Sequence, residues 1–165
     1  FYGRGPWENY CDRKDGAMMD IYTADVEDMY VPYVRPQENG HRVDVRWLEI
    51  LNDKGKGVVI CAETPFEFNA LHNSVEDFDC EESDAPYQWN NFVENDPHDI
   101  GRARNVMKKQ THVSDITPRN FTEVCIDAMM TGVGGDNSWG AETYDKYKVN
   151  TSEPQRLVFK IIPVK

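Results

Sequence analysis

The sequence predicts an all-β fold, a large antiparallel β-sandwich, from two observations. Short segments with alternating or wholly apolar residues are separated by turn signals at intervals of about 8–12 residues, which is typical of antiparallel strands. The segment 157–162 is apolar at nearly every position, as in a strand that is covered on both faces. We therefore expect this last strand to lie centrally between two packed layers.

Length and charge limit the function classes. The chain has 165 residues, 39% of them hydrophobic, and a formal net charge of -11. Its length fits one domain, or a piece of a larger one, that can bury a core. The negative charge argues against nucleic acid and anionic membranes as partners, because both require a positive face. No apolar run approaches the roughly 20 residues of a membrane span.

The first 31 residues are irregular in pattern. Glycine and proline are dense between Gly3 and Gly16, which predicts a turn-rich segment laid against the sheet, with Arg4, Glu8 and Arg13 able to pair around it. Residues 17–31 mix apolar and acidic positions and fit either a strand or a short helix.

The clearest strand signal follows the pair Asn39-Gly40, which predicts a type I′ hairpin turn. Behind it Val43, Val45 and Trp47 alternate with polar residues, as expected of a half-buried strand. A second turn is predicted at 52–57. Further strands are predicted at 58–62, 66–70 and 121–127.

An acidic stretch interrupts these strands. It contains nine acids and no Lys or Arg between His72 and Ile100, and we interpret it as a solvated loop. The histidines show no metal-ligand spacing and the cysteines form no Cys-x-x-Cys pair, so we expect no metal site and partly buried free thiols. The cysteines are Cys11, Cys61, Cys80 and Cys125.

The segment 131–140 is the strongest candidate for a functional loop. It holds four of the eleven glycines and presents one large flat side chain, Trp139. Gly134 and Gly135 permit close approach of another surface, and Asp136, Asn137 and Ser138 are expected to lock the turn. An indole packs well on a sugar ring. A phosphate loop is excluded because it would end in Gly-Lys-Ser/Thr, whereas a tight connection with a core tryptophan stays open.

Three blocks carry a family resemblance. They are residues 3–13 (GRGPWENYCDR), 30–40 (YVPYVRPQENG) and 132–139 (GVGGDNSW), hereafter the first, second and third blocks. In this order and spacing the chain resembles the C-terminal, or small-chain, domain of family 2 glycoside hydrolases, the large lactose-hydrolysing β-galactosidases. The resemblance covers nearly all of residues 1–165, treated as a single domain, except an insertion around 79–106.

The resemblance implies part of a galactose-mutarotase-like supersandwich. It implies that the catalytic glutamates of this retaining enzyme, and the Mg and Na ions of the parent, belong to other domains. The fragment itself is then expected to have no catalytic residue, no metal and no activity alone. Trp139 would form one wall of the galactoside site in the mouth of the catalytic barrel. The parent is expected to be a homo-oligomer of the bacterial type, and the choice between cytoplasm and periplasm stays open.

Two other functions stay open at this point. A free-standing carbohydrate-binding module would need galactose affinity without the barrel. A purely structural sandwich would bury Trp139 within its own domain.

Overall fold

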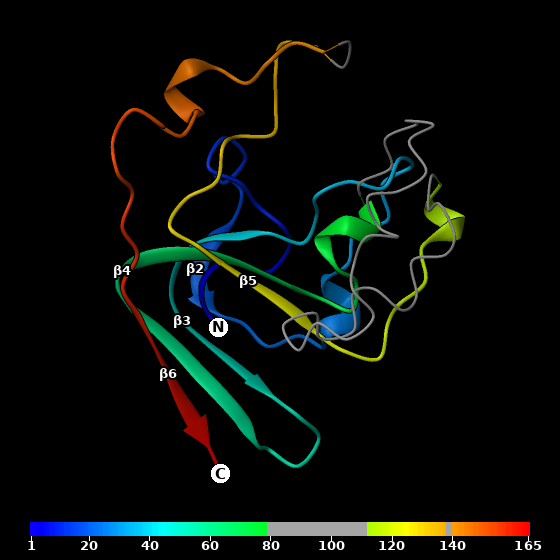
Figure 1. Cartoon of the computed structure of the whole chain (residues 1–165), viewed down its shortest axis with the longest axis vertical. Helices are drawn as coiled ribbons and strands as arrows, with labels where there is room; N and C mark the ends of the chain where they lie inside the picture. Colours follow the sequence, from blue (N-terminus) through cyan, green and yellow to red (C-terminus); the bar gives the residue numbers. More distant parts are fainter. Residues whose placement is uncertain (79–111, 138–139) are drawn as a thin grey trace, which may run out of the picture.

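The computed structural model of the chain describes residues 1–78, 112–137 and 140–165 (Figure 1). The expected insertion around 79–106 lies outside the described residues, as do Cys80, Ser138 and Trp139. In the part that is described, no helix is long and apolar enough to cross a membrane.

The all-β prediction is confirmed. Six strands form one antiparallel sheet in the order β2-β1-β3-β4-β5, with β6 paired to β4, which is consistent with part of a β-sandwich. The strands are β1 (Tyr2–Gly5), β2 (Met18–Ile21), β3 (Arg42–Leu51), β4 (Gly57–Leu71), β5 (Glu123–Asp127) and β6 (Phe159–Val164). Short 3-10 turns connect them: η1 (Val26–Met29), η2 (Val75–Phe78), η4 (Val113–Asp115) and η5 (Asp145–Tyr147). The ambiguous segment 17–31 thus contains both a strand and a helical turn.

The predicted turn at 52–57 is confirmed as the β3–β4 connection. The side-chain Oδ1 of Asn52 accepts the backbone N–H groups of Lys54 at 2.9 Å and Lys56 at 3.1 Å. Gly55 adopts φ 71°, which glycine tolerates at no steric cost. The loop therefore closes on its own asparagine side chain.

The hairpin predicted at Asn39-Gly40 is wrong. No strand lies between 30 and 41, and a type I′ turn needs φ > 0 at both residues, whereas only Gly40 has it, at φ 75°. Instead, the Asn39 side chain is buried, and its Oδ1 accepts the N–H of Val31 at 3.0 Å. The pair shapes a buried loop rather than a hairpin.

The alternation predicted in β3 holds only as far as Val45. Asp44 has φ 58°, and the register between β3 and β4 shifts before and after Val45, as at a β-bulge. Leu48 is then the next buried residue, and Trp47 is half-buried. The extra residue changes which side chains face the core, and the residue types alone did not show this.

The strands predicted at 58–62 and 66–70 are one strand, β4. Its first half pairs with β6, from Gly57 to Ala62, and its second half pairs with β5, from Glu67 to Leu71. Pro65 lies at the change of partners, where it interrupts no ladder pair and is exposed, so a proline is tolerated within the strand.

The core lies on one face of the sheet and is dominated by aromatic residues. Phe66 and Phe68 on β4 and Val45 on β3 are completely buried. The Phe1 ring meets Phe68 edge-on at 5.3 Å between centroids. Cys11 and Cys61 carry half-buried free thiols, as expected.

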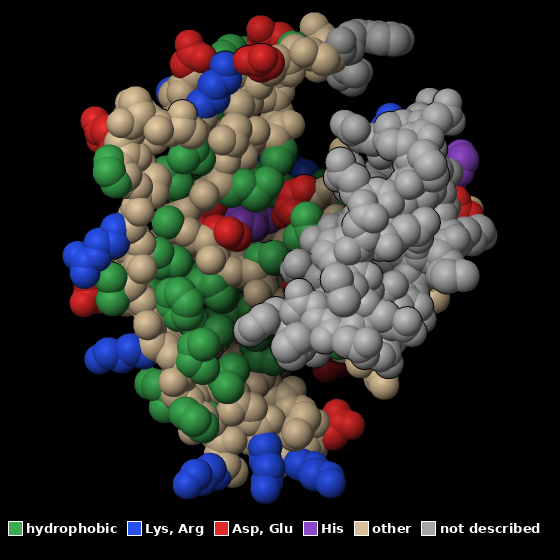
Figure 2. All heavy atoms as spheres, viewed as in Figure 1, with side chains coloured by type: hydrophobic (Ala, Val, Ile, Leu, Met, Phe, Trp, Pro, Cys, Tyr) green, Lys and Arg blue, Asp and Glu red, His purple; other side chains and the backbone are tan. Residues whose placement is uncertain are grey.

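The central position predicted for the last strand is wrong. β6 lies at the edge of the sheet and pairs with β4, and its apolar side chains are exposed: Phe159 by 42%, Ile161 by 58% and Ile162 by 48%. Figure 1 shows β3, β4 and β6 extending together to the end of the molecule where the C-terminus lies. The described residues supply no second layer over this end, and Figure 2 shows hydrophobic side chains gathered on the open face.

Candidate functional site

The first and second blocks meet at the carboxylate of Glu8, which is 5% exposed. Its Oε2 accepts the backbone N–H of Gly40 at 2.9 Å. Its Oε1 accepts a hydrogen bond from Arg13 at 3.1 Å and a short one from the hydroxyl of Tyr33. The expected pairing of Glu8 with Arg13 is therefore present. Charge-assisted bonds of this kind fix a loop firmly, because a buried carboxylate that loses them has little water to replace them.

Asn9 attaches the first block to β3. Its backbone N–H donates to the carbonyl of His41 at 2.8 Å, and its side-chain Oδ1 accepts the N–H of Val43 at 3.1 Å. The side-chain amide donates to the carbonyls of Arg4 at 2.9 Å and Trp7 at 3.0 Å. All the hydrogen-bonding capacity of this buried residue serves to fix the backbone around it.

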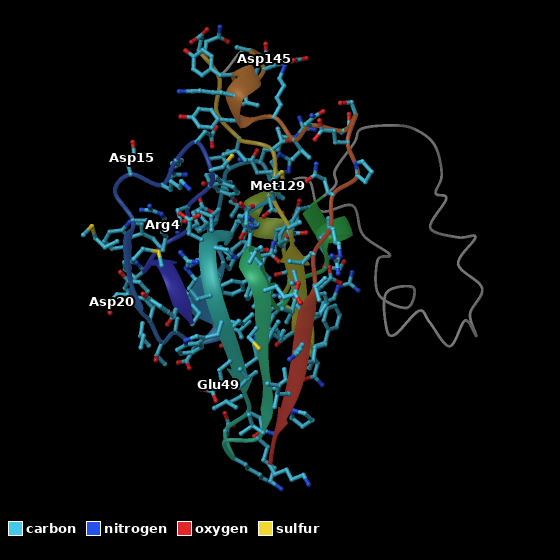
Figure 3. The ribbon with its side chains drawn as sticks, turned by 90° about the vertical axis from the view of Figure 1, so that its left-hand side faces the viewer. Arg4, Asp15, Asp20, Glu49, Met129 and Asp145 are labelled. Carbon is cyan, nitrogen blue, oxygen red and sulfur yellow. The ribbon has the colours of Figure 1, made fainter. Side chains whose placement is uncertain are left out.

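Arg42 fastens the second block to the first. Its guanidinium donates to the carbonyls of Gly40 at 2.6 Å and Pro6 at 2.9 Å. Burial lowers the pKa of Arg42 to about 10, although the nearby Glu8 charge opposes this shift. Arg4, in contrast, bonds Asp44, which also accepts from Lys14 (Figure 3 shows Arg4 on the side of the molecule formed by β1).

Asp12 attaches the third block to the first. Its Oδ2 accepts the backbone N–H of Gly134 at 2.8 Å and the hydroxyl of Thr143 at 3.3 Å. Asp12 lies 122 positions before Gly134 and 131 positions before Thr143 in the sequence, so these are long-range contacts. The loop that the sequence singled out therefore rests on the first block.

The loop is also held by its own flanks. The N–H of Gly132 donates to the carbonyl of Tyr147 at 2.9 Å, and the N–H of Val149 donates to Thr131 Oγ1 at 3.2 Å. The hydroxyl of Tyr144 makes a short hydrogen bond to Asp136. Figure 1 shows this segment, with η5, reaching beyond the sheet at the end opposite β6.

The structure places the loop-shaping residues as follows. Gly134, Gly135, Asp136 and Asn137 are exposed. A Cβ at Gly135 would lie 2.3 Å from the carbonyl oxygen of Ala141, so the glycine permits close approach within this chain. Ser138 and Trp139 lie outside the described residues. The role of Trp139 in a sugar site stays a prediction.

A second polar cluster, which the sequence analysis did not single out as a site, lies on the face of β4 opposite the core. His41 is 1% exposed, and its Nε2 lies 2.9 Å from Glu67 Oε2, while its Nδ1 lies 4.0 Å from Glu38. The ring stacks on Tyr10 at 5.3 Å between centroids. Figure 2 shows acidic and histidine side chains together in the middle of one face.

Burial dominates the ionisation of this cluster. Burial raises the pKa of Glu38 and of Asp127, and the His41 charge opposes the rise in both. Burial, together with the charge of Glu8, also raises the pKa of Tyr10. The signal that was available in the sequence is the alternation Phe66-Glu67-Phe68-Asn69, which places Glu67 and Asn69 together on one face of β4.

The cluster is not arranged for hydrolysis or metal binding. Glu67 and Asp127 are cross-strand neighbours, but Glu67 is 9% exposed and holds His41, so it offers no open carboxylate to a glycosidic bond. Among the described residues, no group of three or more His, Cys, Asp or Glu is placed to hold a metal ion. The cluster joins the loop before β3 to β4.

Comparisons with known proteins point in one direction. Residues 1–161 match the family model of the β-galactosidase small chain. The chain is 32% identical to a β-galactosidase of Priestia megaterium over 99% of its own length and 13% of that protein. It is 32% identical to one of Halalkalibacterium halodurans over 98% of its length and 13% of that protein, and 29% identical to one of Streptococcus thermophilus over 99% and 13%.

The chain thus spans about 13% of the length of these relatives. The matched range, residues 1–161, includes all three blocks and the two residues that join them, Glu8 and Asp12. On this evidence the chain belongs to the β-galactosidase small-chain family.

Proposed function

We propose that this chain is the non-catalytic C-terminal domain of a family 2 β-galactosidase of the lactose-hydrolysing type. Its support is the family match over residues 1–161, together with relatives that are named β-galactosidases and are several times longer than this chain. In a retaining glycosidase two carboxyl groups stand roughly 5 Å apart across the bond that is cleaved. Such a pair, with the Mg and Na ions of the parent, is assigned to the other domains.

The contribution of this domain is an aromatic wall, Trp139. The observation that carries the proposal is the anchoring of the loop on both sides of 138–139. On one side Gly134 is bonded to Asp12, and on the other Thr143 is bonded to the same carboxylate. A platform on fixed flanks loses little conformational entropy when a sugar stacks on it. The galactoside stacks on the indole, and the reacting groups come from the catalytic barrel.

The test is the kinetics of the full-length parent carrying Trp139→Ala or Trp139→Phe. Loss of about 1.5 kcal/mol of stacking raises KM for a chromogenic galactoside about ten-fold in the alanine variant, and phenylalanine restores part of it. Val133→Ala is the matched control, since Val133 is 50% exposed on the same loop. An unchanged KM in Trp139→Ala removes this residue from the sugar site.

Two alternatives make different predictions. A free-standing carbohydrate-binding module binds galactose as the isolated chain, which titration calorimetry detects. A purely structural domain leaves KM unchanged in every loop variant and lowers the unfolding temperature of the parent instead. The expected homo-oligomeric parent is tested by its mass in solution.

A further inference from the structure

The first block contains an exposed tryptophan that the proposed function does not use. Trp7 is 67% exposed, although the residues that follow it, Glu8, Asn9 and Tyr10, are all buried. An exposed indole beside a cavity offers a flat apolar face on which a ligand can stack. Trp7 also lines a cavity of about 300 Å³, formed by the loop between β1 and β2.

The backbone that carries Trp7 is locked in place. The carbonyl of Pro6 accepts a hydrogen bond from Arg42 at 2.9 Å, and the carbonyl of Trp7 itself accepts one from the Asn9 side chain at 3.0 Å. The indole is therefore presented from a rigid support, which reduces the entropy lost when a ligand binds to it.

Polar groups with unused capacity surround the cavity. Among the described residues, Asp12 Oδ1 is buried and has no hydrogen-bond partner, and the carboxylate of Asp15 makes no hydrogen bond or ion pair. Figure 3 shows Asp15 on the outer side of this loop. Arg13 uses one nitrogen of its guanidinium for Glu8 and Tyr33, which leaves the rest of the fork to donate.

The charges select a kind of ligand. The lining holds both acids, including Asp12 and Asp15, and bases, Arg13 and Lys14. The acids repel a phosphate. Within the part of the chain that the structure describes, no group of three or more His, Cys, Asp or Glu is placed to hold a metal ion here. A neutral ring with neighbouring hydroxyl groups fits better, because it stacks one apolar face on an indole while its hydroxyls both donate to carboxylates and accept from a guanidinium.

We propose that the cavity beside Trp7 is a second carbohydrate site, which takes one hexopyranose ring. A volume of about 300 Å³ lies at the small end of ligand pockets, which suits a single ring. The lining of this site comes from the first block and the residues that follow it, whereas Trp139 belongs to the third block. It holds a sugar unit of a saccharide at the domain surface and takes no part in hydrolysis.

Hydroxyl-radical footprinting of the full-length parent, read by mass spectrometry, tests the site directly. The probes are methyl 1-thio-β-D-galactopyranoside and methyl 1-thio-β-D-glucopyranoside. We expect a Kd of about 1 mM, which corresponds to about 4 kcal/mol of binding free energy, so each probe is used at a concentration several times this Kd. Trp7 oxidation is expected to fall at least three-fold with one probe or both. Met18, which is 70% exposed and outside the cavity lining, is the internal reference for radical scavenging.

Variants extend the test. Asp15→Ala is expected to raise the probe concentration that half-protects Trp7 about ten-fold, whereas Ile21→Ala, at an exposed apolar position outside the cavity lining, leaves it unchanged. Trp139→Ala also leaves it unchanged, so the failure of one site is distinguishable from the failure of the other.

Two results overturn the proposal. One is a Trp7 to Met18 oxidation ratio that neither probe changes. The other is a Trp7 that is already unreactive in the parent without sugar, which would mean that another domain covers the indole.

Discussion

Two regions of this chain reverse the usual distribution of side chains. Around Glu8 and His41, polar groups are buried: Glu8 is 5% exposed and His41 1%. Along β6, apolar groups are exposed, with Ile161 at 58%. We call the first region, formed by Glu8, Tyr33, Gly40, His41 and Glu67, the polar hub.

The two regions differ in whether the described residues satisfy their side chains. Every member of the polar hub finds its hydrogen-bond partner within the described residues, and the partners come from different sequence blocks. Within the described residues, β6 pairs only with β4, and its apolar side chains Phe159, Ile161 and Ile162 are exposed. Ile161 on β6 pairs with Ile60 on β4, which is 5% exposed and belongs to the core. The exposed apolar surface of β6 is therefore adjacent to the hydrophobic core.

The largest expected effect compares two phenylalanines. Phe68→Ala removes a fully buried ring and is expected to lower the free energy of unfolding by about 3–5 kcal/mol, because a cavity remains in the core. Phe159→Ala on β6 removes a ring that is 42% exposed and is expected to cost about 1 kcal/mol or less. Urea unfolding of the chain measures both. Equal losses would mean that β6 is covered in solution.

The next effect concerns the polar hub. Glu8→Ala is expected to lower the free energy of unfolding by about 3 kcal/mol, because the buried N–H of Gly40 and the hydroxyl of Tyr33 lose their acceptor. The bond to Arg13 contributes little of this, since that side chain is 61% exposed. Glu63→Ala, an exposed acid on β4, is the control and is expected to change stability by less than about 0.5 kcal/mol.

A result of less than about 1 kcal/mol for Glu8→Ala would show that water replaces the carboxylate. The polar hub would then not depend on the hydrogen bonds within it, and it would not differ from β6 in the way described above.

The fold class was predictable because strand periodicity is a local property. The β3–β4 turn at Asn52 follows from residue types alone, since asparagine and glycine act on their own backbone. The position of β6 was not predictable in the same way. Its apolar pattern is typical of a strand that is covered on both faces, but residue types alone do not show whether other residues of the chain supply that cover.

The site was predictable only in part, for a related reason. The third block was recognised by its glycines, but its anchor, Asp12, lies 122 residues away from Gly134 and carries no local signal. Asn39-Gly40 was misinterpreted as a hairpin because the acceptor for the Gly40 N–H is Glu8, a long-range partner that local turn rules ignore. His41 and Glu67 are 26 residues apart, and only the pairing of β3 with β4 brings them together.

A smaller effect is expected at the link between the first and third blocks. Asp12→Ala removes the acceptor for Gly134 and Thr143 and is expected to cost about 1–2 kcal/mol of local stability. Hydrogen exchange of the Gly134 amide is then expected to accelerate about ten-fold, while amides of β4 keep their protection. Asp20→Ala, on exposed β2, is the control. No change in exchange at Gly134 would show that the flanks of the loop hold it without Asp12.

The smallest effect is the pH dependence of two carboxylates that differ in their setting. Burial raises the pKa of Asp127, opposed by His41 and aided by Glu67. Burial also opposes ionisation of Asp44, but hydrogen bonds from Arg4 and Lys14 outweigh it and lower the pKa of that group. As pH rises from about 4, the unfolded chain releases the Asp127 proton before the folded chain does, so this group makes the fold less stable as pH rises through its folded pKa. Asp44 acts in the opposite direction: its contribution is present above the unfolded pKa and is lost as pH falls.

Asp127→Asn is therefore expected to remove a loss of stability that develops as pH rises above about 4. Asp44→Asn is expected to remove a contribution to stability that is lost as pH falls below about 4. Urea unfolding across this range gives the two slopes, with Asp20→Asn as an exposed reference. Opposite signs for the two variants would mean that a buried carboxylate without a lysine or arginine costs stability at neutral pH, whereas a paired one adds to it. The same sign for both would show that His41 compensates Asp127 as fully as Arg4 and Lys14 compensate Asp44, and the polar hub would then extend to β5.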